Sequence, residues 1–344
     1  MIDTVKIYSA IPEKIYNVIY NNSIVKSSIN KKDGEILYEI VNDHLEGSYS
    51  SSLSVRIGCG SMYNLVEFDY FIEVEGSYHK IWKGFNSHDG VYNLQYIVKE
   101  FINLVENAYN IKLPEFNKWY LQRIDIAKCF DILNQQNVCE YINSLSSCRY
   151  SRRKLKFFAN ESLYIPGTTT TLKIYNKMLE FRKHDQNKFK DTDFNLEKYY
   201  NNIQGFIRFE IEIKKKRLQT MYGIDKKHIS VKDLEYYEFE KVWSDEFMKL
   251  LGILENDLKI VKGKEEAKKR LITIYGQNKG IRLFNFYCSI QLNGIDFMKK
   301  DMTLPTYYRY IKDLKDARVD YSQTYQIEEV QTFWFNPFEC EEVI

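Results

Sequence analysis

The chain has 344 residues and a formal net charge of +2, and 15% of its residues are aromatic while Gly and Pro number only 15 and 5. This length favours two domains, and this composition excludes a disordered chain. A charge so close to zero does not by itself indicate a nucleic-acid partner, because DNA binding depends on local basic patches.

Neither membrane insertion nor export is indicated by the sequence. No stretch offers the roughly 20 consecutive apolar residues of a membrane span, and the first residues lack the charged start and apolar run of a secretion signal. The six cysteines are scattered and form no CxxC pair. A zinc ribbon or a disulfide framework is therefore not expected, and we predict a reduced, cytoplasmic protein without membrane contact.

The first third of the chain has the pattern of a sheet. Five segments mix β-branched or aromatic residues with polar ones and predict strands at 3–10, 23–30, 35–41, 52–59 and 66–76. Apolar residues then recur at helical spacing in 91–107, which predicts an amphipathic helix over one face of that sheet.

Three later strands, at 120–132, 168–177 and 205–214, alternate polar with apolar residues. Side chains alternate along a strand, so each of these strands has a polar face. The polar sets are Arg123 and Asp125, then Lys173, Tyr175 and Lys177, then Arg208, Glu210 and Glu212. We predict a central antiparallel sheet in which residues 117–130, 169–177 and 206–214 are neighbours, because only then do the polar faces share one site.

The segment 183–204 is expected to be helix plus loop, and helical periodicity dominates after residue 230. The sequence near residue 303 resembles a helix-turn-helix, with Pro305 in the first turn of the second helix. On that helix we expect Leu304, Tyr308 and Ile311 to pack inward and Arg309, Tyr310 and Lys312 to be exposed. No Lys or Arg follows Arg318, so the acidic, aromatic tail is interpreted as a structural wrap or a partner contact.

The predicted fold class is therefore α+β. An antiparallel-sheet catalytic domain with flanking helices, residues 1–235, precedes a helical, winged-helix-like DNA-binding domain with an acidic tail, residues 236–344.

Cleaving a DNA phosphodiester requires a nucleophile, nearby cations and a divalent metal. Mg²⁺ and Mn²⁺ prefer carboxylate oxygens, and Asp125, Glu180 and Glu210 lie on or just after the polar-faced strands, close to Tyr175. The alternative is that Arg123 and Asp125 simply pair with neighbours on a solvated face. The five histidines are isolated from one another, and no nucleotide-binding glycine loop is present.

Two basic clusters lie close in sequence to these strands. Residues 149–156 include Arg152 and Arg153, and residues 214–219 include Lys214 and Lys215. Either cluster could follow DNA phosphates, although a run of like charge is more often only a solvated surface.

Five segments, 72–86, 123–131, 167–185, 207–217 and 304–320, resemble the phage and plasmid replication proteins of the II/X family. That family includes the filamentous-phage gene II initiators, and its motifs are similar to those of Rep_trans plasmid initiators and mobilisation relaxases. The YxKxxE block, which follows a GTTTT strand in IYNKMLE, is the most specific part. The resemblance implies origin-specific nicking, covalent attachment to the 5′ phosphate, and a free 3′ hydroxyl that primes synthesis.

By this resemblance Tyr175 would be the nucleophile, with Asp125, Glu180 and Glu210 as metal ligands and Arg123, Lys177 and Arg208 as supporting charges. Tyr164, Tyr199 and Tyr200 are close enough in sequence to compete as nucleophiles, and whether one or two tyrosines act stays open.

The leading expectation is a rolling-circle initiator that nicks one strand with Mg²⁺ or Mn²⁺. Its expected partners are single- and double-stranded origin DNA and, beyond the DNA, a host helicase and polymerase, with no prediction for its oligomeric state. A relaxase of a conjugative or mobilisable element would use the same chemistry, whereas a non-enzymatic DNA-binding regulator would bind DNA without nicking it.

Overall fold

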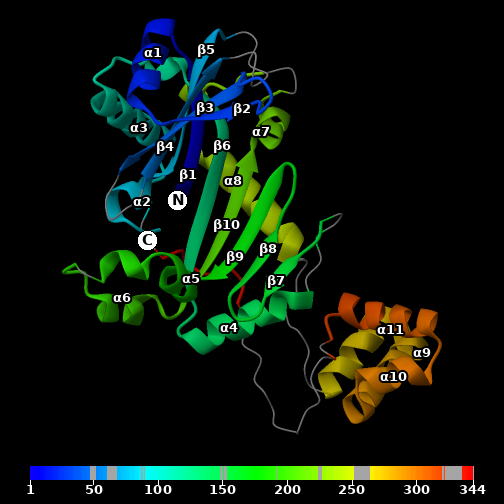
Figure 1. Ribbon diagram of the computed structural model, residues 1–344. Helices are drawn as coiled ribbons and strands as arrows, with labels where there is room; N and C mark the ends of the chain where they lie inside the picture. The colour runs from blue at the N-terminus through cyan, green and yellow to red at the C-terminus, as the bar shows by residue number, and fades with distance from the viewer. Residues whose placement is uncertain are drawn as a thin grey trace.

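The computed structural model describes residues 1–46, 52–59, 68–86, 88, 90–147, 150, 153–190, 192–223, 227–251, 264–319, 321 and 335–343. These residues form a ten-stranded antiparallel sheet in the order β2-β3-β4-β5-β1-β6-β10-β9-β8-β7 (Figure 1). The strands are β1 (Ile2–Ala10), β2 (Val25–Ile29), β3 (Ile36–Glu46), β4 (Ser52–Cys59), β5 (Tyr70–Ser77), β6 (Tyr120–Asp131), β7 (Lys156–Phe158), β8 (Ser162–Ile165), β9 (Thr170–Asn176) and β10 (Phe206–Lys214).

Helices precede, interrupt and follow the strands along the chain. They are α1 (Glu13–Asn22), α2 (Tyr78–Lys83), α3 (Leu94–Tyr109), α4 (Gln135–Ser144), α5 (Lys177–His184), α6 (Leu196–Ile203), α7 (Lys215–Tyr222), α8 (Tyr236–Leu251), α9 (Lys264–Asn293), α10 (Ile295–Asp301) and α11 (Leu304–Asp316), with short 3-10 turns at Phe116–Lys118, Leu145–Ser147, Gln186–Phe189 and Val231–Asp233. The predicted α+β class, with an antiparallel sheet followed by a helical region, is confirmed. None of the described helices combines the length and hydrophobicity that a membrane span requires.

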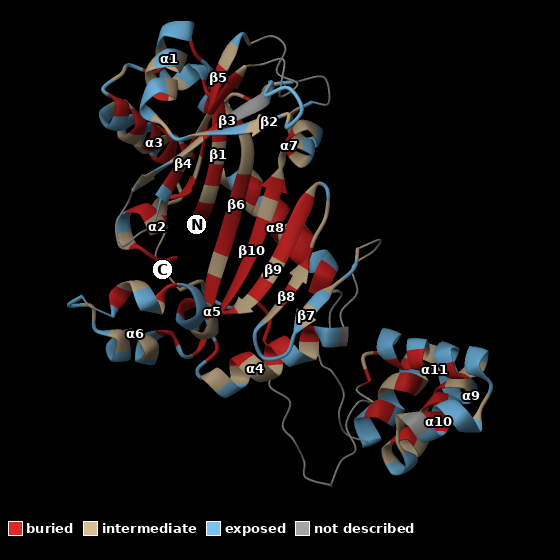
Figure 2. Cartoon of the chain, in the orientation of Figure 1, coloured by how far each residue is buried: buried red, intermediate tan, exposed pale blue. Residues whose placement is uncertain are grey.

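One face of the sheet carries the main hydrophobic core. Alternate residues of β6 and β10, such as Ile124, Ile126, Phe209 and Ile211, point to this face and pack with buried residues of α3, α4 and α8. Figure 2 shows that the central strands are buried along most of their length. Because neighbouring side chains point the opposite way, the other face receives the polar residues of the same strands.

The central strands pair as the sequence predicts. β10 lies between β6 and β9, with Glu212 opposite Asp125, Glu210 opposite Lys173, and Arg208 opposite Tyr175. Helices α5 and α6 pack over the end of the polar face through an aromatic cluster that includes Phe181, Phe189 and Phe206. The polar groups at the centre are therefore buried and close together.

Two large hydrophobic clusters divide the helices. The buried residues of α8, among them Trp243 and Phe247, belong to the sheet core, whereas α9, α10 and α11 form a second core around Leu271, Leu283 and Leu314. The expected boundary near residue 235 would have put α8 with the C-terminal helices, but its apolar side packs against the sheet. The described part of the acidic tail, residues 335–343, also returns there, with Phe335 in the sheet core.

Helix α11 begins at Leu304 with a proline in its first turn, as expected, but its buried side differs from the expectation. Tyr307, Ile311 and Leu314 are buried, whereas Leu304 and Tyr308 are 51% and 55% exposed. The buried residues follow the i, i+4, i+7 spacing, so the helix is rotated about its axis relative to the expected one.

Trp243→Ala tests the assignment of α8 to the sheet core. Trp243 is 1% exposed, and its indole donates a hydrogen bond to the Phe209 carbonyl oxygen at 3.2 Å. We expect the substitution to lower the free energy of unfolding of the sheet by about 3–5 kcal/mol, because a large buried side chain leaves a cavity.

Hydrogen exchange measured segment by segment gives the readout. Protection should fall in β6 and β10 and stay unchanged in α9, and Tyr237→Ala, which removes an exposed ring from the same helix, should change neither. Loss of protection confined to α9–α11 would instead place α8 with the C-terminal helices.

Candidate active site

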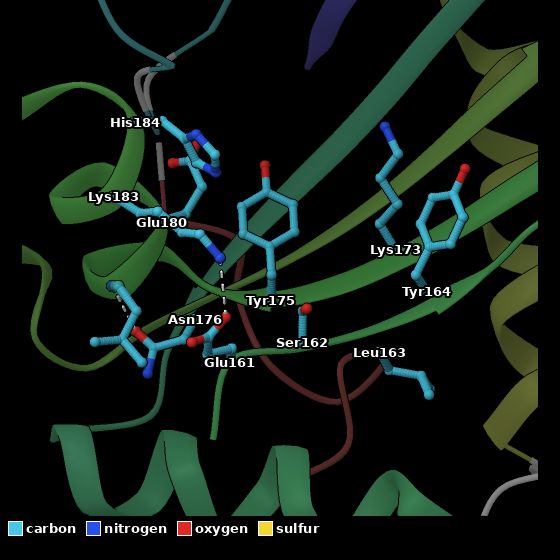
Figure 3. A pocket seen from close by; sticks show the side chains of 11 residues that line it. Glu161, Ser162, Leu163, Tyr164, Lys173, Tyr175, Asn176, Glu180, Lys183 and His184 are labelled. Carbon is cyan, nitrogen blue, oxygen red and sulfur yellow. Dashed lines mark hydrogen bonds and ion pairs between the residues drawn. The ribbon is translucent and has the colours of Figure 1, made fainter. Parts of the chain in front are cut away.

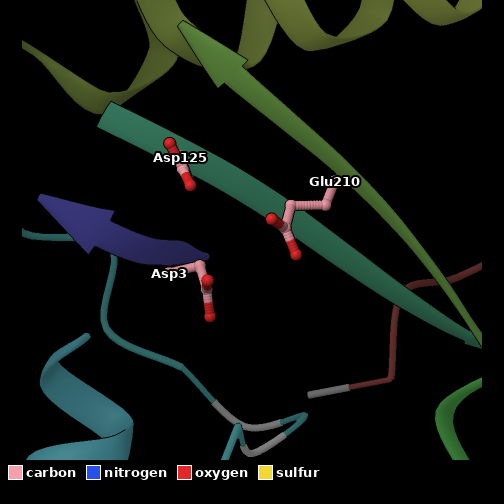
Figure 4. Close-up of side chains that lie close together, drawn as sticks. All are labelled: Asp3, Asp125 and Glu210. Carbon is pink, nitrogen blue, oxygen red and sulfur yellow. The ribbon is translucent and has the colours of Figure 1, made fainter. Parts of the chain in front are cut away.

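Three carboxylates from three strands meet on the polar face of the sheet. Asp3 of β1, Asp125 of β6 and Glu210 of β10 are all buried, and one oxygen of each lies within 4.8 Å of the others (Figure 4). The predicted proximity of Asp125 and Glu210 is thus confirmed, and the strand pairing that produces it is the predicted one.

Asp3 joins the cluster because β1 is irregular at that point. Ile2 pairs with Ile126 and Thr4 pairs with Asp125, so the register shifts between Ile2 and Thr4 and leaves one extra residue on β1. A bulge of this kind redirects a side chain. Simple alternation places Asp3 with the apolar residues Val5 and Ile7, which is why sequence analysis missed it.

A cation accompanies each of the three carboxylates. The Arg208 guanidinium lies 2.7 Å from Asp3, and Lys173 Nζ lies 2.7 Å from Glu210. Arg123 donates two hydrogen bonds to Asp125, at 2.8 and 2.6 Å. Arg123 also reaches Glu75 at 2.9 Å, so this face carries ion pairs beyond the cluster.

The carboxyl groups differ in their affinity for protons. Burial raises the pKa of Asp125 to about 7, and Glu210 adds to the rise, although Arg123 opposes it. Burial also disfavours the charge on Asp3, but Arg208 outweighs it and lowers the pKa of that carboxyl. The cluster therefore contains one carboxylate that stays ionised and one that is easily protonated near neutral pH.

Tyr175 connects β9 to the cluster. Its hydroxyl donates a hydrogen bond of 3.0 Å to Glu210 Oε2, and its backbone pairs with Arg208. Burial raises the pKa of the Tyr175 phenol well above its ordinary value, and Glu210 raises it further while Arg208 lowers it. The resting side chain is a neutral phenol whose proton points at a carboxylate.

Lys177 and Glu180 lie on a helix rather than on the strand. β9 ends at Asn176, whose side chain accepts a hydrogen bond from the Leu179 N–H and caps α5. Lys177, fully buried, places its Nζ 2.8 Å from Glu180. Burial disfavours the charge on Glu180, but Lys177 outweighs it and lowers the pKa of that carboxyl. The carboxylate cluster thus contains two of the three expected ligands, with Asp3 in the place expected for Glu180.

The competing tyrosines have different surroundings. Tyr164 of β8 is opposite Lys173 and lines a surface pocket that Tyr175 also lines (Figure 3). Tyr200 donates a hydrogen bond to Gln186 at 2.6 Å, and Tyr199 packs against Phe181 with ring centroids 4.6 Å apart. Both belong to the aromatic cluster under α5 and α6.

Most of the basic residues singled out near the sheet make contacts within the protein. Arg153 donates hydrogen bonds to the carbonyl and hydroxyl oxygens of Thr170, and Lys214 donates to the Gly167 carbonyl oxygen at 2.8 Å. Lys215 Nζ lies 5.7 Å from the Tyr8 ring. Arg152 lies outside the described residues.

On α11, Arg309 and Lys312 are exposed as expected. Tyr310 is half-buried, with its ring centroid 5.2 Å from that of Phe286 in the helical core. The two cations are therefore the residues of this set that face solvent freely enough to meet a phosphate.

Comparison with known families agrees with the resemblance drawn from the sequence. Residues 1–244 match a family model described as the N-terminal part of a phage replication-associated protein. No curated protein matches the chain. The matched range contains every strand of the sheet, the three carboxylates and Tyr175, and it covers well over half of the chain. The chain belongs to this family of phage replication-associated proteins.

Proposed function

We propose that the protein initiates rolling-circle replication by nicking one strand of an origin, with Tyr175 as nucleophile and a divalent cation at the carboxylate cluster. The single observation that carries this proposal is the 3.0 Å hydrogen bond from the Tyr175 hydroxyl to Glu210, which is itself one of the three clustered carboxylates. A phenol, an acceptor for its proton and a metal-binding donor set thus occupy one buried site.

The step transfers a phosphoryl group from a sugar oxygen to tyrosine. The Tyr175 Oη atom forms a bond to phosphorus while the bond from phosphorus to the 3′ oxygen breaks. The tyrosine proton passes to Glu210, and the departing 3′ oxygen takes a proton from water. The products are a 5′ phosphotyrosine and a free 3′ hydroxyl, and the stored phosphodiester bond permits later rejoining.

The donor set suits a hard divalent cation. Asp3, Asp125 and Glu210 offer oxygen atoms from three strands held rigidly by one sheet, which is the donor chemistry that Mg²⁺ and Mn²⁺ prefer. When bound, such a cation would neutralise charge that develops on the phosphate. We propose these three residues as its ligands, with Glu180 outside the set.

The basic residues around the site have separable roles in this proposal. Arg208 orients Asp3 and lowers the pKa of Tyr175, so it favours the phenolate that attacks. Arg123 orients Asp125, and Lys173 orients Glu210. Lys177 acts more remotely, by holding Glu180.

Origin DNA is the proposed partner, as single strand at the sheet and as duplex at α11. Exposed Arg309 and Lys312 suit phosphate contacts beside a groove. A host helicase and polymerase would extend the 3′ end that the nick creates. A relaxase would perform the same step, and only the DNA sequence cleaved separates the two.

Tyr175→Phe should abolish covalent attachment to DNA while the protein folds and binds DNA normally. The ring and its packing remain, and only the hydroxyl and its hydrogen bond are lost, at a cost of about 1 kcal/mol in stability. The assay incubates each protein with Mn²⁺ and single-stranded oligonucleotides of randomised sequence, and separates adducts on a denaturing gel.

Tyr164→Phe and Tyr200→Phe are the matched controls and should keep the adduct. An adduct that survives in Tyr175→Phe would move the nucleophile to Tyr164, Tyr199 or Tyr200. If the unaltered protein binds DNA but gives neither nick nor adduct, it is a regulator.

Metal binding should strengthen as pH rises through about 7. In the metal-free protein the folded pKa of Asp125, about 7, exceeds its unfolded value of about 3.9, so the stability that this group contributes is full at low pH and is lost as pH rises through 7. A cation must displace the proton below pH 7, so its affinity should increase by up to about tenfold per pH unit there and then level off.

Thermal unfolding with and without Mn²⁺, at about pH 6 and about pH 8, measures this effect. Asp3→Asn should remove most of the Mn²⁺ stabilisation, and Glu180→Gln, which likewise takes a carboxylate from a buried cation, should retain it. The opposite pattern would restore Glu180 to the metal site and exclude Asp3.

Substituting both Arg309 and Lys312 with Ala should weaken binding to duplex DNA without changing the rate of cleavage of a bound single strand. Each lost phosphate contact should reduce the slope of log affinity against log salt by about 0.9. Lys241→Ala, which removes an exposed cation from α8, is the control. An unchanged salt slope in the double variant would remove α11 from the duplex interface.

A further inference from the structure

A pocket of about 180 Å³ opens directly beside Tyr175 (Figure 3). Strands β8 and β9 and helix α5 line it, and we call it the β8–α5 pocket. Its lining includes Leu163, Tyr164, Tyr175, Leu179, Glu180 and Lys183. The pocket therefore shares the Tyr175 side chain with the carboxylate cluster but extends away from that cluster, toward the edge of the sheet.

The strand register fixes the distance between the two tyrosines. Ser162 is opposite Tyr175, and Tyr164, two residues further along β8, is opposite Lys173. Tyr164 and Tyr175 are thus diagonal neighbours on one face of an antiparallel pair, with α-carbons separated by about 7–8 Å. Figure 3 shows the Tyr164 ring on one side of Tyr175, and Glu180, Lys183 and His184 of α5 on the other.

The pocket combines apolar, aromatic and cationic groups. Leu163 and Leu179 supply apolar surface, and Lys156 Nζ lies 5.7 Å from the centre of the Tyr164 ring. Lys183, on α5, lies 3.5 Å from Glu161, and both side chains are largely exposed. An aromatic ring with cations close by is the combination that proteins use to hold single-stranded nucleic acid, because bases stack on the ring and phosphates meet the cations.

We infer that the β8–α5 pocket receives one nucleobase of the nucleotides that flank the cleaved phosphate, and that this base stacks on Tyr164. The inference rests on the proposed role of Tyr175. A phosphate within bonding reach of the Tyr175 hydroxyl carries a sugar and a base on each side, and the pocket is the hollow that begins at that same side chain. Removing the base from its neighbours also exposes the backbone for attack.

This arrangement makes Tyr164 a substrate-binding residue rather than a second nucleophile. Its strand position puts it opposite Lys173, while Tyr175 is the tyrosine whose hydroxyl is hydrogen-bonded to Glu210. Stacking needs the ring and not the hydroxyl, so Tyr164→Phe should behave as the unaltered protein, whereas Tyr164→Ala should not.

The first experiment locates the base without requiring cleavage. The full chain is irradiated with oligothymidylate in which 5-iodouracil replaces some thymines, and the crosslinked peptides are identified by mass spectrometry. We expect the main crosslink at Tyr164, its loss in Tyr164→Ala, and its retention in Tyr237→Ala, which removes an exposed tyrosine from α8. Crosslinks that lie only outside residues 161–184 would overturn the inference.

The second experiment measures what the base contributes to cleavage. Oligonucleotides that the protein cleaves are remade with an abasic residue at either position flanking the nick. Cleavage should slow about tenfold or more at one of the two positions, in keeping with base–aromatic stacking. In Tyr164→Ala the parent and abasic strands should be cleaved at the same reduced rate, whereas Tyr164→Phe should still distinguish them.

The two experiments separate this inference from the proposed nicking activity. Equal cleavage of the parent strand and both abasic strands by the unaltered protein would remove the base pocket and leave the nicking activity in place. A Tyr164 crosslink without cleavage of any oligonucleotide would support the pocket for single-stranded DNA and remove Tyr175 as the nucleophile.

Discussion

The ion pair between Arg208 and Asp3 is the contact on which the polar face of the sheet depends. Arg208 belongs to β10 and Asp3 to β1, and β6 lies between these strands, so the guanidinium reaches across a whole strand to make a 2.7 Å contact. The residues of β6 beneath this crossing are small: Ala127 is opposite Glu210, and Cys129 is opposite Arg208. Larger side chains there would separate the pair and leave two buried charges without partners, which costs several kcal/mol.

The buried charges also set the proton affinity of the site. Three carboxylates within 4.8 Å repel one another, and the sheet cannot relax to separate them because each comes from a different strand of one hydrogen-bonded unit. Burial and Glu210 raise the pKa of Asp125 to about 7, while Arg208 lowers that of Asp3. A divalent cation relieves the same repulsion more completely than a proton does, so the cluster is suited to exchange one for the other.

The sequence predicted the central strands well because their alternation of polar and apolar residues survives in the sheet. The polar residues of β6, β9 and β10 share one face, and only the end of β9 was wrongly assigned: Asn176 caps α5, so Lys177 and Glu180 lie on a helix. Asp3 could not be found by alternation, since a one-residue register shift in β1 reverses its direction. On α11, Tyr307 is buried and Tyr308 exposed because neighbouring tyrosines look alike in a pattern but lie about 100° apart around a helix.

The environment of Tyr175 looks unfavourable for a nucleophile, since burial raises the pKa of its phenol well above the ordinary value. The same burial puts the hydroxyl in a medium where nearby charges act strongly, because a low dielectric magnifies each electrostatic contribution. Arg208 already lowers that pKa, and Glu210, which raises it, would lose much of its charge to a cation bound at the cluster. Neutralising Glu210 therefore changes the balance from holding the phenol proton to releasing it. In our proposal the tyrosine stays inert in the metal-free protein and becomes nucleophilic only when a cation and a phosphate occupy the site together, which would limit attack to DNA that is correctly placed.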